Sequence, residues 1–300
     1  MTAVTPDPVA DAGRRWRPRD VVVFFVLAYA LSWLWTLPFV VAGDVVRRGV
    51  GWPTHYPALL GPCVAALIVI ARRSGRPGLA ELARRTVRWR IGWRWWIVAV
   101  SPLGFLAVAL VGIRAAGRDL PAAADFGLFS GTPAVGLGGV FLMITFVGAL
   151  GEEVGWRGYA LPQLQRRFAP LTATLVLAPL WAGWHLPQFF VIQTYRDFGP
   201  VEYVGMVLGL TCGAVVLTWL YNRSGGSVLA VIVWHGVYNT VGATQAAAGV
   251  VAAVVSTLVM VQGGLLIVLE VRARGRHEPS VLAPPATTAA ATRSVRSRVP

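Results

Sequence analysis

Apolar residues occur along this chain in runs about as long as a bilayer is thick, separated by short polar or arginine-containing segments. A helix needs about 20 apolar residues to cross the hydrocarbon core of a membrane. The pattern therefore predicts an all-α, polytopic membrane helix bundle of about eight transmembrane helices. The second run is short and only small residues divide the last two, so seven or nine spans remain open. The expected spans are residues 20–43, 56–71, 94–113, 133–151, 171–192, 201–221, 227–244 and 246–270.

The composition agrees with this class, because 56% of the residues are hydrophobic and only 13% are charged. All 27 basic residues are arginine, and the net charge is +14. Such a charge can indicate a nucleic-acid partner, but the chain has neither basic repeats nor nucleic-acid-binding motifs. We therefore expect no nucleic acid and attribute the charge to membrane topology.

The arginines are concentrated in particular loops. The richest segments precede the first span, join spans two and three, and follow spans four, six and eight, so they share one side of an eight-span path. Because cytoplasmic loops are enriched in basic residues, we expect both termini to be cytoplasmic in a multi-pass protein of the inner (plasma) membrane. The pairs Arg47 with Arg48 and Arg114 with Arg118 fall on the other side and weaken the bias without reversing it.

Three parts follow from this topology. Residues 1–19 form a cytoplasmic N-terminal segment, and residues 20–270 form the transmembrane bundle, whose motif core spans 130–245. Beyond Arg276 the chain consists largely of Pro, Ala, Thr, Ser and Arg without apolar periodicity. We therefore expect residues 271–300 to be a disordered cytoplasmic tail.

Ionisable and amide side chains interrupt the apolar runs at three places. They are Glu152, Glu153 and Arg157 in the fourth run, His185 in the fifth, and His235 with Asn239 in the seventh. An ionisable group inside a membrane costs several kcal/mol unless pairing or function retains it. These clusters are therefore the candidate functional site.

Helical spacing separates the two adjacent carboxylates. If the fourth helix continues to about Leu161, Glu153 and Arg157 stand at i and i+4, the favoured spacing for an ion pair. Glu152 then points about 100° away and has no cation nearby in the sequence. We expect Glu152 to perform chemistry as a general base or acid, and Glu153 with Arg157 to support the helix end.

The histidine positions suggest a shared site. His235 and Asn239 are also at i and i+4 and face one direction, where both can donate hydrogen bonds to a developing oxyanion. His185 follows Trp181 by one turn, and Pro187 two residues later can kink the helix and admit water.

The ordered motifs Glu-Glu-x-x-x-Arg, aromatic-x-x-x-His and His-x-x-x-Asn resemble those of the CAAX protease and bacteriocin-processing (CPBP, or Abi) family of intramembrane endopeptidases. The resemblance covers residues 130–245, and Trp156-Arg157-Gly158 adds to it. Position 181 is Trp where Phe is common in the family. The family fold is a bundle of about eight helices with a cavity open to the cytoplasmic side.

The resemblance implies a role for each polar residue. Glu152 would activate water with help from His185, and His235 and Asn239 would stabilise the tetrahedral oxyanion. Glu153 and Arg157 would be the supporting pair. The implied reaction is hydrolysis of a peptide bond in or near the membrane.

A metal remains an alternative. Glu152, His185 and His235 are the ligand types of a His₂Glu zinc site with an open water position. The chain lacks His-Glu-x-x-His, the spacing that would make zinc the default. We favour the glutamate mechanism without metal, with zinc as the open cofactor question.

The substrate and the function class stay open in part. The family implies a peptide or membrane-protein substrate, and membrane lipid is the other expected partner. The implied processes are prenyl-protein-like processing, peptide maturation or bacteriocin self-immunity. The chief alternative is a proton- or cation-coupled transporter that uses the same residues as a polar path. The chain shows no internal repeat of the kind that many transporters have. A catalytically silent immunity protein on the same scaffold is the third alternative.

Overall fold

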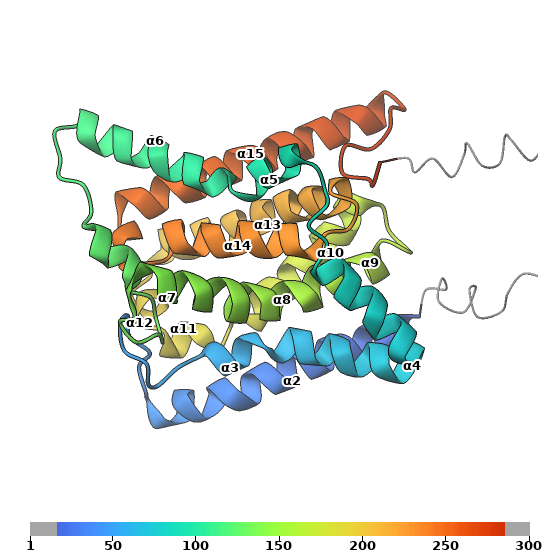
Figure 1. Cartoon of the computed structure of the whole chain (residues 1–300), viewed down its shortest axis with the longest axis horizontal. Helices are drawn as coiled ribbons and strands as arrows, with labels where there is room; N and C mark the ends of the chain where they lie inside the picture. The colour runs from blue at the N-terminus through green and yellow to red at the C-terminus, as the bar shows by residue number, and fades with distance from the viewer. Residues whose placement is uncertain (1–16, 286–300) are drawn as a thin grey trace, which may run out of the picture.

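The chain folds as a bundle of helices in the computed structural model, which describes residues 17–285 (Figure 1). The predicted all-α class is confirmed, and each predicted apolar run contains helix. The long helices are α2 (Pro18–Ala42), α4 (Gly61–Thr86), α6 (Ser101–Ala115), α10 (Pro170–Trp184), α13 (Pro200–Arg223), α14 (Val228–Gly242) and α15 (Val250–Gly275). Shorter helices are α3 (Tyr56–Leu59), α5 (Trp93–Ala99), α7 (Gly136–Met143), α8 (Leu150–Gly155), α9 (Leu161–Leu164), α11 (Gln188–Val191) and α12 (Gln193–Arg196).

Five helical segments of the described chain are long and apolar enough to cross a membrane, and six if α5 and α6, bent by 48°, form one span. The protein is therefore a multi-pass membrane protein. The two remaining predicted spans correspond to α10 and α14, which have 15 residues each. A straight helix of that length rises about 22 Å, less than the hydrocarbon thickness of a bilayer.

Two helix ends differ from the prediction. The fifth span was expected to reach residue 192, but α10 ends at Trp184, where His185 and Leu186 make tight i→i−3 hydrogen bonds to Ala182 and Gly183. Pro187 explains this, because it disfavours helical backbone at the residue before it. The second span is longer than predicted, since α4 reaches Thr86 through a break at Gly75 (φ 55°).

The predicted disorder from residue 271 is wrong for the described part of that segment. Helix α15 continues to Gly275, and Leu282 behind it is fully buried. The buried carboxylate of Glu270 accepts hydrogen bonds from the Ser280 hydroxyl (2.8 Å) and the Leu282 amide (3.2 Å), and Asn222 donates to the Leu282 carbonyl (2.7 Å). These tertiary contacts hold a segment whose composition predicted none. Residues 286–300 lie outside the described part.

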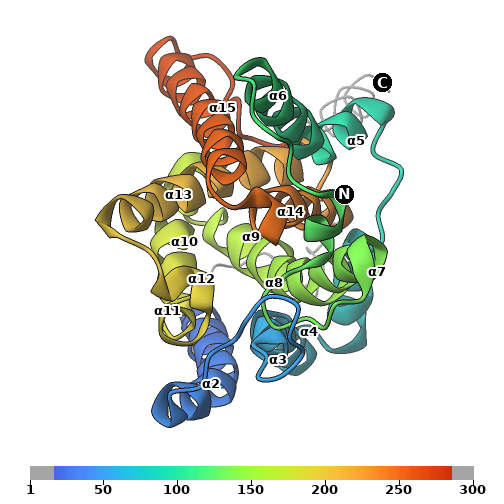
Figure 2. The ribbon, with the colours of Figure 1, turned by 90° about the vertical axis from the view of Figure 1, so that its left-hand side faces the viewer.

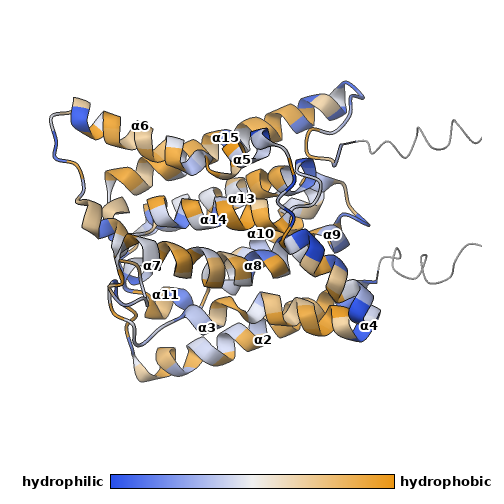
Figure 3. Ribbon diagram, viewed as in Figure 1, coloured by the Kyte–Doolittle hydropathy of each residue, from blue (hydrophilic) through white to orange (hydrophobic). Residues whose placement is uncertain are grey.

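The bundle has two ends of different character (Figures 1 and 3). At the right-hand end in Figure 1, which we call the arginine end, α2 begins and α4, α9, α13 and α15 end. Tertiary hydrogen bonds join the chain there, including Arg85 to the Tyr221 hydroxyl (2.7 Å) and Arg88 to the Gly225 carbonyl (3.0 Å). Its arginines are Arg17, Arg19, Arg72, Arg73, Arg76, Arg84, Arg85, Arg88, Arg90, Arg166, Arg167, Arg223, Arg272, Arg274 and Arg276, and its acids are Asp20, Glu81, Glu270 and Glu278.

The opposite end, which we call the cavity end, consists of the segments 43–55, 116–135, 185–199 and 243–249. Backbone hydrogen bonds connect these segments, from Gln193 to Val46, from Gly131 to Arg47 and from Gln245 to Leu128. In these segments positive and negative residues are equal in number: Arg47, Arg48, Arg118 and Arg196 against Asp44, Asp119, Asp125 and Asp197.

Helices α8 and α14 run through the middle of the bundle. Figure 2, which looks at the cavity end, shows them surrounded by α2, α4, α6, α7, α13 and α15. The two helices carry two of the three polar clusters that the sequence singled out. The fold therefore places its most polar residues at the centre.

Candidate active site

One nearly continuous helix carries the first motif. It runs from Gly136 to Leu164 through α7, α8 and α9, which are joined by the π-helical segments η2 (Ile144–Ala149) and η3 (Trp156–Ala160). The condition that this helix continues to about Leu161 is met, since it ends at Leu164. Wide π turns inside α-helices are frequent at functional sites, and here they stand on both sides of α8.

Glycines bring α8 against α3 and α4. A Cβ atom on Gly151 would lie 2.5 Å from the Leu59 carbonyl oxygen, and one on Gly155 would lie 2.5 Å from Pro62 Cβ. No side chain fits at either position without displacement of the backbone opposite. This Gly-x-x-x-Gly spacing is the close-packing pattern of membrane helices, and it fixes α8 and therefore the two glutamates on it.

The two glutamates occupy different environments, as predicted. Glu152 is buried, and its Oε2 accepts a hydrogen bond from the Trp181 indole N–H (2.8 Å). Glu153 is fully buried, and its Oε1 accepts from Arg157 Nη1 (2.8 Å). The predicted Glu153–Arg157 ion pair is therefore present.

Glu153 has a second partner that the sequence did not reveal. The same Oε1 lies 2.9 Å from Nδ1 of His235, a residue far along the chain on α14. Arg157 itself is fully buried, with its guanidinium carbon 4.4 Å from the Trp181 ring centre. Glu153 thus joins Arg157 to His235, in addition to supporting its own helix.

His185 is held by its own helix. Its Nδ1 lies 2.8 Å from the Trp181 carbonyl oxygen, and its ring packs edge-on against Trp184, with ring centres 4.8 Å apart. The Trp181 ring lies 5.9 Å from the His185 ring and 5.8 Å from the His235 ring. Trp181 is therefore the common neighbour of Glu152, Arg157 and both histidines.

The predicted catalytic residues meet at one cavity of about 80 Å³. Glu152, His185, His235 and Asn239 all line it, and they come from three parts of the chain. The cavity has room for water molecules, since each occupies about 30 Å³ in the liquid. The remaining lining residues are His55, Tyr56, Leu59, Phe129, Ile144, Gly148, Gln188, Tyr195 and Ala243.

Sequence reasoning did not identify His55, Tyr56, Gln188 or Tyr195 as part of this site. Among them His55 is buried, and its Nδ1 has no hydrogen-bond partner within the described residues. Burial, together with the charge of nearby His185, lowers the pKa of His55 to about 4. One signal was present, since His55 is one of only four histidines and directly precedes an apolar run.

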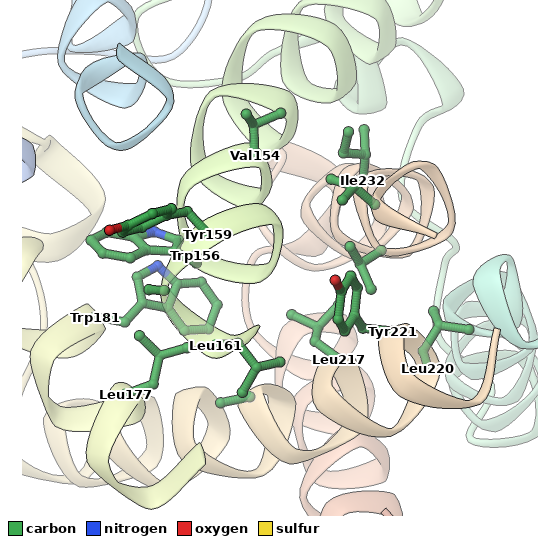
Figure 4. Packing of buried hydrophobic residues seen from close by; sticks show 14 of the residues in the cluster. Val154, Trp156, Tyr159, Leu161, Leu177, Trp181, Leu217, Leu220, Tyr221 and Ile232 are labelled. Carbon is green, nitrogen blue, oxygen red and sulfur yellow. The ribbon is translucent and has the colours of Figure 1, made fainter. Parts of the chain in front are cut away.

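The side of Glu152 that faces the arginine end is lined by buried side chains. Trp156, Arg157, Leu161 and Leu177 are buried there, and Figure 4 shows the Trp156, Tyr159 and Trp181 rings packed between neighbouring helices. Along the length of the bundle, all the other residues that line the cavity lie at the same depth as Glu152 or nearer the cavity end. The helix ends that flank the described chain lie at the arginine end, whereas the lining residues of the cavity lie toward the other end (Figure 1).

Hydrogen-bond partners fix the histidine tautomers. A carbonyl oxygen only accepts, so Nδ1 of His185 carries the proton, and Nε2 is left as an acceptor when the ring is neutral. Nδ1 of His235 likewise faces a carboxylate and donates to it, so its Nε2 donates only when the ring is cationic. His185 can thus accept a proton or orient water, and His235 can stabilise negative charge as an imidazolium.

The donor set does not assemble a metal site. Glu152, His185 and His235 have ligand chemistry suited to zinc, but no three His, Cys, Asp or Glu residues in the described part of the chain stand together as ion ligands. Glu152 Oε2 is also already bonded to the Trp181 N–H. We therefore derive no step through a metal.

The fold and the site together define a multi-pass membrane protein with a buried glutamate–histidine centre. Comparison with known proteins shows what the chain is similar to. Residues 134–241 match the family described as type II CAAX prenyl endopeptidase, Rce1-like. A protein of Methanococcus maripaludis named CAAX prenyl protease 2 is 22% identical over 225 residues, which cover 72% of this chain and 82% of that protein.

Over the matched region the chain is similar to type II CAAX prenyl endopeptidases of the Rce1-like kind, the group of proteases that the motifs resembled. This match agrees with the predicted family and enzyme class. The matched region spans all six residues to which the sequence assigned roles.

Proposed function

We propose that this protein hydrolyses a peptide bond of a membrane-associated polypeptide at the cavity, with Glu152 as the base that activates water. The observation that carries the proposal is the convergence of Glu152, His185, His235 and Asn239 on one water-sized cavity. Trp181 occupies one oxygen of the Glu152 carboxylate, and the residue has no cation partner among the described ion pairs. The carboxylate is thus held in place while it retains capacity to accept a proton.

The reaction uses the remaining groups in order. Water gives a proton to Glu152 while its oxygen attacks the scissile carbonyl, and the Nε2 lone pair of His185 orients that water. The carbonyl becomes a tetrahedral oxyanion, to which cationic His235 and the Asn239 amide donate hydrogen bonds. Glu152 then returns the proton to the leaving amine as the C–N bond breaks. The products are one carboxylic acid and one amine, which ionise to a carboxylate and an ammonium group.

Glu153 and Arg157 position this centre without contacting the substrate. The Glu153 carboxylate orients the His235 ring and stabilises its cation, as a carboxylate does for histidine in hydrolytic triads. Arg157 balances the charge of Glu153 and packs over Trp181, which in turn binds Glu152. Glu153 and Arg157 therefore contact His235 directly and Glu152 through Trp181.

The family description favours a substrate in which the scissile bond lies beside a lipid or membrane segment. The cavity of about 80 Å³ holds water but no peptide, whereas small-molecule sites usually enclose several hundred Å³. Helices around the cavity must therefore separate to admit a polypeptide. We also propose eight crossings with both termini cytoplasmic, which is supported by the position of both flanking helix ends at the arginine end.

The test compares the membrane peptidomes of cells that carry the native protein and the Glu152→Gln variant at equal abundance. The proposal expects a cleavage product that disappears in the variant, and in His185→Ala and His235→Ala as well. A null phenotype that is fully rescued by all three variants would refute the protease function.

The pH profile tests the assigned protonation states once a substrate is known. His235 acts as a cation, so kcat/KM should fall at high pH as His235 loses its proton. His235→Gln retains a neutral N–H donor at that position. It should lower activity and remove the alkaline decline; an unchanged alkaline decline would exclude the oxyanion role of His235.

A further inference from the structure

Gln188 is a buried polar residue of the cavity wall to which the proposed reaction gives no role. It is 4% exposed and begins α11, three residues after His185. It lines the cavity together with Glu152, yet its side-chain amide makes no hydrogen bond within residues 17–285. Buried polar groups nearly always have a hydrogen-bond partner, so an unpaired amide beside a catalytic centre calls for an explanation.

The amide of Gln188 borders the open space of the cavity. Some unpaired polar atoms of the described chain are completely enclosed by protein, such as Trp156 Nε1 and Thr145 Oγ1, and the Gln188 amide atoms are not among them. Both its oxygen and its nitrogen are therefore accessible from the cavity that the residue lines. A molecule in the cavity can thus use the donor and the acceptor of this side chain.

Backbone hydrogen bonds fix Gln188 beside His185. The main-chain N–H of Gln188 donates to the His185 carbonyl (2.8 Å), and the Ile192 N–H donates to the Gln188 carbonyl (2.9 Å). His185 is itself held through Nδ1 at the Trp181 carbonyl (2.8 Å). The two side chains therefore have fixed places on one turn of the chain and reach the same cavity.

A carboxamide matches the hydrogen-bonding groups of a peptide main chain. Its oxygen accepts from a peptide N–H, and its NH₂ group donates to a peptide carbonyl. Gln188 is uncharged and no arginine lines the cavity, so a peptide group fits this position better than a carboxylate or a phosphate. The four groups of the proposed reaction are already engaged with the water and the scissile carbonyl, which leaves Gln188 to hold the chain next to them.

We infer that Gln188 binds the main chain of the substrate at a peptide group next to the scissile bond. It thereby holds the scissile carbonyl against the water that Glu152 activates. This inference rests on the proposed function for the identity of the reaction. Because the bound peptide group does not itself react, its hydrogen bonds are present in the ground state and in the transition state alike. Their loss should therefore raise KM and leave kcat close to its native value.

The same residue should contribute nothing to the stability of the free protein. A buried polar group without a protein partner costs free energy, so an apolar side chain of the same shape should leave the fold as stable or make it more stable. An amide with a structural role would show the opposite. Substrate binding and stability should therefore respond in different ways to the loss of this amide.

The substitution Gln188→Met tests the inference, because methionine keeps the length and volume of glutamine without its N–H donors and amide oxygen. Gln193→Met on α12 is the matched control, since the Gln193 amide donates to Asp197 (2.6 Å) and the residue does not line the cavity. The substrate is a peptide that reproduces the Glu152-dependent cleavage site found by the peptidome comparison. The full chain in detergent is assayed for kcat, KM and the midpoint of thermal unfolding.

The inference expects Gln188→Met to raise KM about 10- to 100-fold, the effect of losing two neutral hydrogen bonds. The midpoint of thermal unfolding should equal or exceed the native value, and Gln193→Met should keep the native KM. An unchanged KM for Gln188→Met would overturn the inference. A lower midpoint, or loss of the unfolding transition, would also overturn it, because the amide would then support the fold.

Ester-containing substrates identify the peptide group that Gln188 binds. In each substrate one amide bond near the scissile bond is replaced by an ester, which removes the N–H and weakens the carbonyl as an acceptor. At the bound group the ester should raise KM for the native protein and have little further effect in Gln188→Met, because changes at two contacting groups are not additive. Additive effects at every position would overturn the inference alone. Absence of any Glu152-dependent product would instead refute the proposed function, and the inference with it.

Discussion

The half of the bundle on the arginine side of Glu152 and the half on the cavity side contain similar polar and aromatic residues, but they differ in packing and in expected function. Toward the arginine end, Glu153, Arg157 and the tryptophans around them are buried, and Glu153 Oε1 accepts a hydrogen bond from Arg157. Toward the cavity end, Glu152, His185 and His235 border a water-sized space. The packed half can hold its neighbours in fixed geometry because it excludes water, and the cavity half can react because it admits water.

The comparison predicts that substitutions in the cavity half change activity first. The largest effect is expected for Glu152→Gln, which retains an oxygen to accept the Trp181 hydrogen bond but removes the base. The rate of hydrolysis should fall about 10²- to 10⁴-fold, the usual contribution of general base catalysis. Thermal unfolding in detergent should stay close to that of the native protein. Retained activity would exclude Glu152 as the base.

Substitutions in the packed half should change stability first. Arg157→Met leaves the Glu153 carboxylate fully buried without its cation, and loss of one partner from a buried pair costs about 3–5 kcal/mol. The free energy of unfolding in detergent measures this cost. Adding Glu153→Gln to Arg157→Met should recover part of the loss, because the buried carboxylate that lost its guanidinium partner is then neutral. A double variant that is less stable than Arg157→Met would contradict the pairing.

A smaller effect is expected where α8 meets α4. Gly155→Ala places a Cβ atom against Pro62 and its backbone, and overpacking of this kind costs about 1–3 kcal/mol. Gly104→Ala on α6 is the matched control, since a Cβ atom there meets nothing within 4 Å. Equal thermal stability of the two variants would show that close packing does not position α8.

The smallest effect is expected at the surface of the arginine end. Arg84 pairs with Glu81 at 2.6 Å, but the Arg84 side chain is 59% exposed. Exposed ion pairs contribute about 0–1 kcal/mol, so Arg84→Met should leave the midpoint of thermal unfolding nearly unchanged. Because this variant makes the same substitution as Arg157→Met, it isolates the effect of burial. A loss as large as that of Arg157→Met would mean that charge rather than burial determines the cost.

Local spacing predicted part of the site well. Residues four apart on a helix share a face, so the Glu153–Arg157 pair and the common direction of His235 and Asn239 followed from the sequence. The different environments of Glu152 and Glu153 followed from the 100° between adjacent residues. The contact between Glu153 and His235 did not, because it joins positions far apart in the chain and depends on how α8 and α14 pack.

The helix ends were less predictable for the same reason. Apolar length located the helices, but it did not show that α10 ends at Trp184 or that residues after α15 pack against α13. Each of these ends depends on a local break or on a tertiary hydrogen bond. His55 could not be assigned to the site from a sequence in which it follows a loop of unknown path.

The sequence alone determined the all-helical membrane class, the arginine asymmetry and the polar residues that carry the family motifs, because apolar run length, charge count and helical period are local properties. The tertiary structure alone decided that Glu153 binds His235, that Trp181 links the catalytic groups, and that the cavity lies away from the arginine end. These are decided by the packing of distant helices, and the spacing of residues along one helix contains no information about them.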